Sequence, residues 1–191
     1  SIFSDAKRHT MDRIAAAEVH TAPFPHILAA DAFPPHFYAE LQRRKLPDSC
    51  YMRLVDTGRV GANYNPGGLC FMPSQIPPKP AVALRGPATG GVSDDANTGF
   101  WLDFFAAYNE REFLQCWIAR FRDELKARAK SDPERFAQTG GKAEVTSEMF
   151  LMREKQSYAL NPHTDSPSKA ISALFYMPAD ESGIVMGTSL Y

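Results

Sequence analysis

Residues 157–178 read SYALNPHTDSPSKAISALFYMP, and the interpretation of the whole chain depends on this stretch. At its centre His163 and Asp165 are two residues apart, and side chains at i and i+2 of an extended backbone leave the same face. Asn161-Pro162 precedes the pair and Ser166-Pro167 follows it, which predicts an extended run held at both ends. An imidazole and a carboxylate on one face predict a pair of metal ligands.

The residues after this pair predict a buried strand over 168–177, which would form a neighbouring wall. Its period of two places Ser172, Leu174 and Tyr176 on one face and Ile171, Ala173 and Phe175 on the other. Residues 145–152 alternate in the same way and predict an earlier strand, while 180–183 predict a turn and 184–191 a further strand.

The N-terminal part of the chain is predicted to be mainly helix and loop. Helices are expected over 12–19, 34–46, 99–108 with Thr98 as its cap, and 110–129, whose apolar residues fall on one stripe. Short strands are expected over 27–28 and 51–57. Helices followed by closely spaced strands predict an α+β fold with a jelly-roll-like core and helices packed on it.

The chain is expected to form a single domain over 1–191. Its residues 1–143 would be the helical and loop part, and residues 144–191 the first strands of the core. Because 187–191 resemble the inside of a strand, the core is expected to continue beyond Tyr191.

Composition excludes few function classes. The chain has 191 residues, 44% of them hydrophobic and 23% charged, and its formal net charge of −1 gives no general attraction to nucleic acid or an anionic membrane. No apolar run has membrane-spanning length and no signal peptide begins the chain. Cys50, Cys70 and Cys116 are widely spaced and form no CxxC motif, which predicts reduced thiols in a soluble cytoplasmic protein.

Residues 58–99 are rich in glycine and proline and contain no phosphate-binding motif. A stretch of this kind is either a functional lid or a linker. Arg59, Asn63 and Tyr64 are candidates to face a substrate, and a plain surface loop is the alternative.

The donor types at 163 and 165 suit Fe(II), Mn(II) or Zn(II), but two ligands are too few for a catalytic metal. A third imidazole would complete the facial triad of non-haem iron oxygenases, which leaves positions open for a cosubstrate and dioxygen. A chelating 2-oxoacid would need a hydroxyl or a cation at its far carboxylate, and Tyr176 and Ser172 are candidates for that contact.

Three segments carry a resemblance to a known family: PFPHILAADAFPPHFYAEL from residue 23, SYALNPHTDSPSKAISALFYMP from residue 157, and GTSLY from residue 187. Together they resemble the Fe(II)/2-oxoglutarate-dependent oxygenases, most of all the prolyl-hydroxylase-like branch. The resemblance covers residues 23–46 and 147–191.

The resemblance implies a double-stranded β-helix core in which His163 and Asp165 are the proximal metal-binding pair. It implies that Tyr176 hydrogen-bonds the distal carboxylate of 2-oxoglutarate and that Leu174 lines the same cavity. The implied reaction hydroxylates an unactivated C–H bond of a small molecule or protein side chain and releases succinate and CO2. The implied cofactor is Fe(II), with 2-oxoglutarate as cosubstrate and ascorbate as a reductant.

The sequence departs from the family pattern after this point. The family requires a distal histidine and then an arginine or lysine, but no histidine follows His163 and no basic residue follows Lys169. These groups are expected either beyond residue 191 or not at all. His9, His20, His26 and His36 precede the pair, where the family does not place its third ligand, and His26 and His36 are interpreted as packing or solvated side chains.

Two other functions are compatible with the same residues. The pair could hold Zn(II) in a hydrolase, although no HExxH motif supports this. Alternatively, the chain could be a non-catalytic jelly-roll binding module, in which His163 and Asp165 hydrogen-bond each other or cap a turn.

Overall fold

The computed structural model describes residues 1–58, 67–72, 96–132, 145–153, 163, 165, 169–179 and 190. Over these residues the fold is α+β, with five α-helices and one antiparallel sheet of three strands. The chain divides into two compact units. The first comprises Ser1–Gln42, Asn109–Ser147 and Pro162–Tyr191, and the second comprises Arg43–Tyr108 and Glu148–Asn161.

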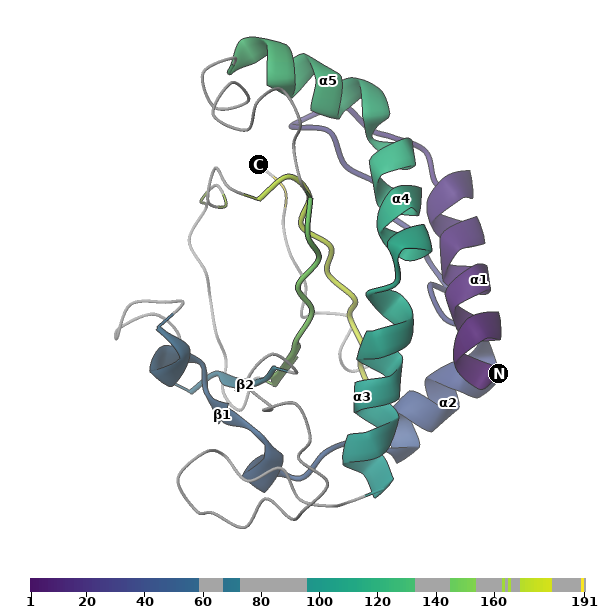
Figure 1. The fold of residues 1–191 in the computed structure, drawn as a ribbon, viewed down its shortest axis with the longest axis vertical. Helices are drawn as coiled ribbons and strands as arrows, with labels where there is room; N and C mark the ends of the chain where they lie inside the picture. The colour runs from purple at the N-terminus through teal and green to yellow at the C-terminus, as the bar shows by residue number, and fades with distance from the viewer. Residues whose placement is uncertain are drawn as a thin grey trace. The chain divides into compact units, whose positions relative to one another are not determined.

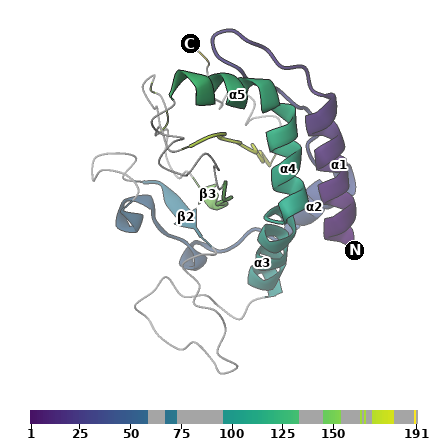
Figure 2. The same cartoon turned by 45° about the horizontal axis from the view of Figure 1, so that its top comes forward.

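The first unit contains α1 (Ile2–Ala16), α2 (Pro35–Arg43), α4 (Arg111–Arg120) and α5 (Arg122–Ser131). Helices α1 and α4 lie side by side in Figures 1 and 2. The predicted helix over 34–46 is confirmed as α2, which buries Phe37 and Leu41.

Helix α1 is longer and earlier than the predicted helix over 12–19, which was wrong at both ends. Its buried side is made of Ala6, Thr10 and Ile14, at a spacing of four residues. Small and polar residues give a weak hydrophobic period, although Thr10 is fully buried and donates its hydroxyl to the carbonyl of Ala32 at 2.7 Å. The helix therefore could not be located from hydropathy alone.

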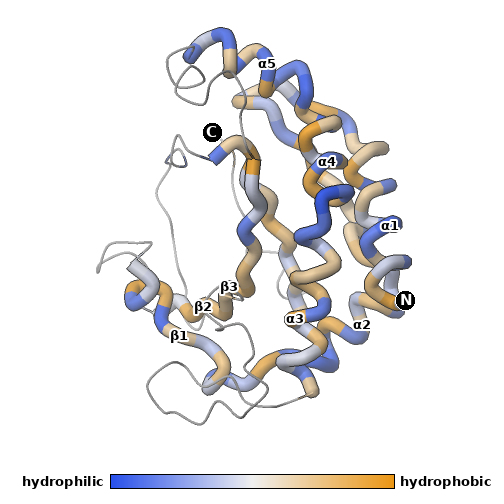
Figure 3. Tube along the Cα trace, viewed as in Figure 1, coloured by the Kyte–Doolittle hydropathy of each residue, from blue (hydrophilic) through white to orange (hydrophobic). Residues whose placement is uncertain are grey.

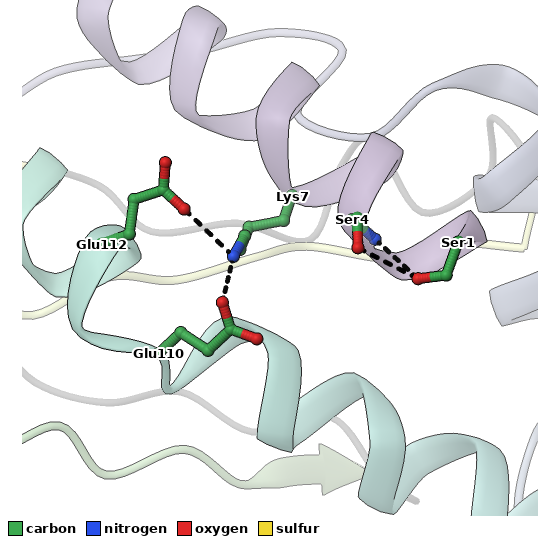
Figure 4. A network of polar contacts seen from close by, with 5 residues as sticks. All are labelled: Ser1, Ser4, Lys7, Glu110 and Glu112. Atoms are coloured by element: carbon green, nitrogen blue, oxygen red, sulfur yellow. Dashed lines mark hydrogen bonds and ion pairs between the residues drawn. The ribbon is translucent and has the colours of Figure 1, made fainter.

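A buried lysine joins α1 to the start of α4. Lys7 is 7% exposed, and its ammonium group pairs with Glu110 and lies 3.3 Å from Oε2 of Glu112, as Figure 4 shows. The hydrogen bond from Lys7 to Glu110 is the main cause of a raised pKa of Lys7, and partial burial opposes it. The ion pairs compensate the desolvation of this charge and fix α1 against α4.

The single helix predicted over 110–129 is instead two helices. The backbone leaves helical geometry at Phe121 (φ −107°, ψ 27°), between α4 and α5. Phe113 and Phe121 are buried, whereas α5 has no buried residue and is mostly hydrophilic in Figure 3. The interruption thus lies where the apolar stripe stops meeting a packed surface.

The second unit is built around α3 (Ala96–Tyr108), an aromatic helix that confirms the prediction over 99–108. Phe100, Trp101, Phe104, Phe105 and Tyr108 are all buried. The indole of Trp101 donates to the carbonyl of Arg44 at 2.7 Å. Thr98 was predicted to cap the helix but lies inside it and is only 2% exposed, because α3 begins earlier than its aromatic pattern suggests.

The sheet of the second unit consists of β1 (Met52–Arg53), β2 (Leu69–Phe71) and β3 (Leu151–Arg153). The strands run antiparallel in the order β1-β2-β3, with Cys70 opposite both Met52 and Met152. Leu54, Cys70 and Met72 form a small apolar core on which Phe150 packs.

The predicted strands were too long. A 3-10 helix, Leu54–Thr57, replaces most of the strand expected over 51–57 and ends at Gly58, whose φ of 71° suits glycine. Residues 145–150 were predicted to be part of a strand but are not, and β3 begins only at Leu151. The strand expected over 27–28 is also absent from this described region, where Leu28 is 73% exposed. Instead, an isolated antiparallel bridge joins His20 to His26.

Within the described residues, no helix is both long and apolar enough to cross a lipid bilayer. All three cysteines are free thiols, with Cys50 and Cys70 buried and Cys116 partly buried.

Candidate functional site

Asp165 is held by two neighbours in the sequence. Its Oδ1 atom accepts a hydrogen bond from the ammonium of Lys169 at 3.1 Å, and its Oδ2 atom accepts one from the hydroxyl of Ser172. The Ser172 hydrogen bond is the largest cause of the lowered pKa of Asp165; partial burial opposes it, while Lys169 and the charge of His163 add to it. The carboxylate is therefore ionised at neutral pH and has a fixed orientation.

His163 is exposed, as is Asp165, and its charge acts on the Asp165 carboxylate. An ionised carboxylate beside an accessible imidazole fits two positions of a divalent metal such as Fe(II) or Zn(II). The described part of the chain holds no group of three or more His, Cys, Asp or Glu side chains arranged to bind a metal.

Helices α5 and α2 hold the two ends of the segment that follows Asp165. Arg128 of α5 donates to the carbonyl of Lys169 at 2.8 Å. At the other end, the side-chain amide of Gln42 in α2 donates to the carbonyl of Met177 at 3.2 Å. The hydroxyl of Tyr38 donates to the carbonyl of Pro178. The strand predicted over 168–177 is absent from the described residues 169–179, where side chains of α5 and α2 bind the carbonyls at the two ends.

The segment was predicted to be buried, but Ser172, Ala173, Leu174 and Tyr176 are exposed, and Ile171, Phe175 and Met177 are only partly buried. Phe175 is partly buried, with its ring centroid 5.4 Å from that of Phe33 and 6.5 Å from that of Trp117. Leu174 and Tyr176 are 65% and 55% exposed. The alternation therefore orients Phe175 toward the helices and its neighbours toward solvent.

The structure brings only some of the candidate residues together. Ser172 contacts Asp165, so its hydroxyl serves the carboxylate that was predicted to bind metal. Leu174 and Tyr176 lie further along, on the exposed face. Sequence reasoning missed Lys169 as a partner of Asp165, although the i, i+4 spacing of opposite charges was a signal for it.

Several predicted features lie outside the described residues. These are Arg59, Asn63 and Tyr64, most of the 58–99 region, nearly all of an extended run predicted over 158–164, and residues 180–189 of the predicted turn and last strand.

The upstream histidines have other surroundings. A ring nitrogen of His9 lies 2.8 Å from the carbonyl of Asp31, and His36 is exposed on α2. His20 and His26 stack on each other across the isolated bridge.

Comparison of the chain with protein-family models, with curated proteins and with solved structures gives no match.

Proposed function

We propose that the protein is an Fe(II)- and 2-oxoglutarate-dependent dioxygenase that hydroxylates an unactivated C–H bond and releases succinate and CO2. His163 and Asp165 would be the proximal metal ligands, and the complete core would be a double-stranded β-helix. One observation carries the proposal: Asp165 is kept ionised and oriented by Ser172 and Lys169, next to an accessible imidazole. Such preorganisation is what a metal ligand requires.

The roles of the other candidate residues follow from their positions. Ser172 would orient Asp165, which revises its expected contact with 2-oxoglutarate. Tyr176, which is 55% exposed, would hydrogen-bond the distal carboxylate of the cosubstrate, and Leu174 would line the same cavity. Bound iron would supply the activation of dioxygen, with ascorbate as a reductant. The third protein ligand and the basic anchor are not assigned to residues of this chain.

The substrate class stays open between a small molecule and a protein side chain. The formal net charge of −1 gives no general attraction to nucleic acid, and a cytoplasmic location remains part of the proposal.

An anaerobic titration with Fe(II) and then 2-oxoglutarate tests the proposal. We expect a weak visible charge-transfer band that appears only when both are present and is lost in His163→Ala and in Asp165→Ala. His36→Ala is the matched control, because this histidine is exposed on α2 and has no proposed role. Absence of the band, with an iron content that His163→Ala leaves unchanged, would refute the proposal.

A non-catalytic binding module is the second candidate. The observation in its favour is that both oxygens of Asp165 already have protein partners, as a purely structural carboxylate would. In that case Fe(II) with 2-oxoglutarate would leave the thermal unfolding midpoint unchanged, whereas a ligand of the folded state raises it.

A further inference from the structure

A second pair of imidazoles lies in the loop between α1 and α2. His20 and His26 form an isolated antiparallel bridge with two backbone hydrogen bonds, of 2.8 Å from His20 N to His26 O and 2.9 Å in return. Residues directly opposite each other in an antiparallel pair place their side chains on the same face. The two ring centroids are accordingly 5.2 Å apart, with the planes inclined by 29°.

A backbone hydrogen bond fixes the tautomer of His26. Its Nδ1 atom lies 2.9 Å from the carbonyl oxygen of Phe24. A carbonyl oxygen only accepts, so Nδ1 carries the proton and donates it, which leaves the lone pair of a neutral ring on Nε2. Metal-binding histidines characteristically donate the other ring N–H to a carbonyl or carboxylate, which orients the ring and raises its basicity.

The loop that carries the pair is attached to helices on both sides. Arg120 of α4 donates to the carbonyl of Ala17, ahead of His20. Arg13 of α1 donates to the carbonyl of Ala30 at 3.1 Å, beyond His26. These contacts, with the bridge itself, order the backbone around the pair before any ligand binds, which lowers the entropy cost of binding.

Both imidazoles remain accessible. His20 is exposed and His26 partly buried, while the ring of Phe24 lies against His26 at 5.8 Å and is itself 48% exposed. Solvent can therefore reach the rings and supply the remaining ligands of a metal ion.

We propose that His20 and His26 form a two-histidine site for a late first-row divalent metal, Ni(II), Cu(II) or Zn(II), with water in the remaining positions. Imidazole suits these ions, and the general order of affinity places Cu(II) above Ni(II). The site resembles neither a structural zinc site, which is closed by four protein ligands, nor an acidic cluster for Ca(II) or Mg(II).

The test is calorimetric titration of the untagged protein with Ni(II) and with Cu(II) in a non-coordinating buffer. In the His163→Ala background, which removes the proposed iron pair, we expect one site that binds Cu(II) more tightly than Ni(II). Adding His20→Gln or His26→Gln should lower its affinity by at least about 10-fold. His36→Gln is the matched surface control and should bind as the unaltered protein does. His163→Ala should also keep this site, which separates it from the proposed iron ligands.

A second measurement covers the case in which a substitution disturbs the loop. In the unaltered protein, substoichiometric Cu(II) should broaden the ring proton signals of His20 and His26 before those of His9 and His36. Broadening of all histidines together, or an unchanged affinity in the double variant His20→Gln/His26→Gln, would overturn the proposal.

Discussion

Replacement of Phe175 by alanine tests how the candidate site segment is held in its unit. The ring of Phe175 packs between those of Phe33 and Trp117, at centroid distances of 5.4 and 6.5 Å. Leu174, the preceding residue, is 65% exposed on the opposite face. The two adjacent positions therefore form a matched pair, in which only one side chain contributes to packing.

The magnitude follows from burial. Truncation of a fully buried phenylalanine to alanine costs about 3–5 kcal/mol. Phe175 is only partly buried, so about half of that, ~2 kcal/mol, is expected for Phe175→Ala. The Leu174→Ala control should change the free energy of unfolding by no more than about 0.5 kcal/mol, as surface substitutions usually do.

Urea unfolding followed by tryptophan fluorescence and circular dichroism measures both variants. For a chain of this length, a loss of ~2 kcal/mol corresponds to a fall in the thermal midpoint of roughly 4–8 °C. If Leu174→Ala costs as much as Phe175→Ala, the assignment of the two faces is wrong. Packing of Phe175 on the helices would then not be what positions the site.

Three further predictions concern ionisable groups. Lys7→Met should destabilise the protein by about 1 kcal/mol through loss of the charged hydrogen bond to Glu110. Because the pKa of Lys7 is raised above its ordinary 10.5, the difference in unfolding free energy between the two proteins should have its full size below pH 10.5. It should disappear as the pH rises through the folded-state pKa, which unfolding measured across alkaline pH would show. Ser172→Ala removes the main cause of the lowered pKa of Asp165, so an NMR titration should place the pKa of this carboxyl nearer its ordinary 3.8. The lowered pKa contributes stability that is present above pH 3.8 and is lost as the pH falls through the folded-state pKa, and this contribution should be smaller in the variant. An unchanged titration of Asp165 would contradict the contact with Ser172. Burial raises the pKa of Tyr51, so Tyr51→Phe should remove a late step from the alkaline phenolate titration and leave the early steps unchanged.

Local pattern was sufficient where a helix buries a continuous aromatic or aliphatic stripe. The spacing of Phe100, Trp101, Phe104 and Phe105 located α3 to within a few residues, because these side chains share one buried side of a helix. The alternation likewise separated Phe175 from Leu174 and Tyr176, but only the contacts of Phe175 with Phe33 and Trp117 decided which side packs.

Local pattern failed where the partner of a segment is distant in the chain. Strand β2 pairs with β1 and β3, and β3 is about eighty residues away from it, so its length depends on hydrogen bonds that no local window contains. The division between α4 and α5 at Phe121 has the same origin, since the apolar period continues there but the buried surface does not. Helix α1 was missed because Thr10 is buried through hydrogen bonds rather than hydropathy.

For the candidate site, the sequence by itself predicted the two donors and their separation, because i and i+2 side chains of an extended backbone share a face. Only the tertiary structure decided what surrounds them. The hydroxyl of Ser172 donates to Asp165, and Arg128 and Gln42 bind carbonyls at the two ends of the segment. The physical reason is that spacing along an extended chain specifies only the side to which a side chain points. Whether a carboxyl group is ionised, and how it is oriented, depends on groups that only folding brings within hydrogen-bonding distance.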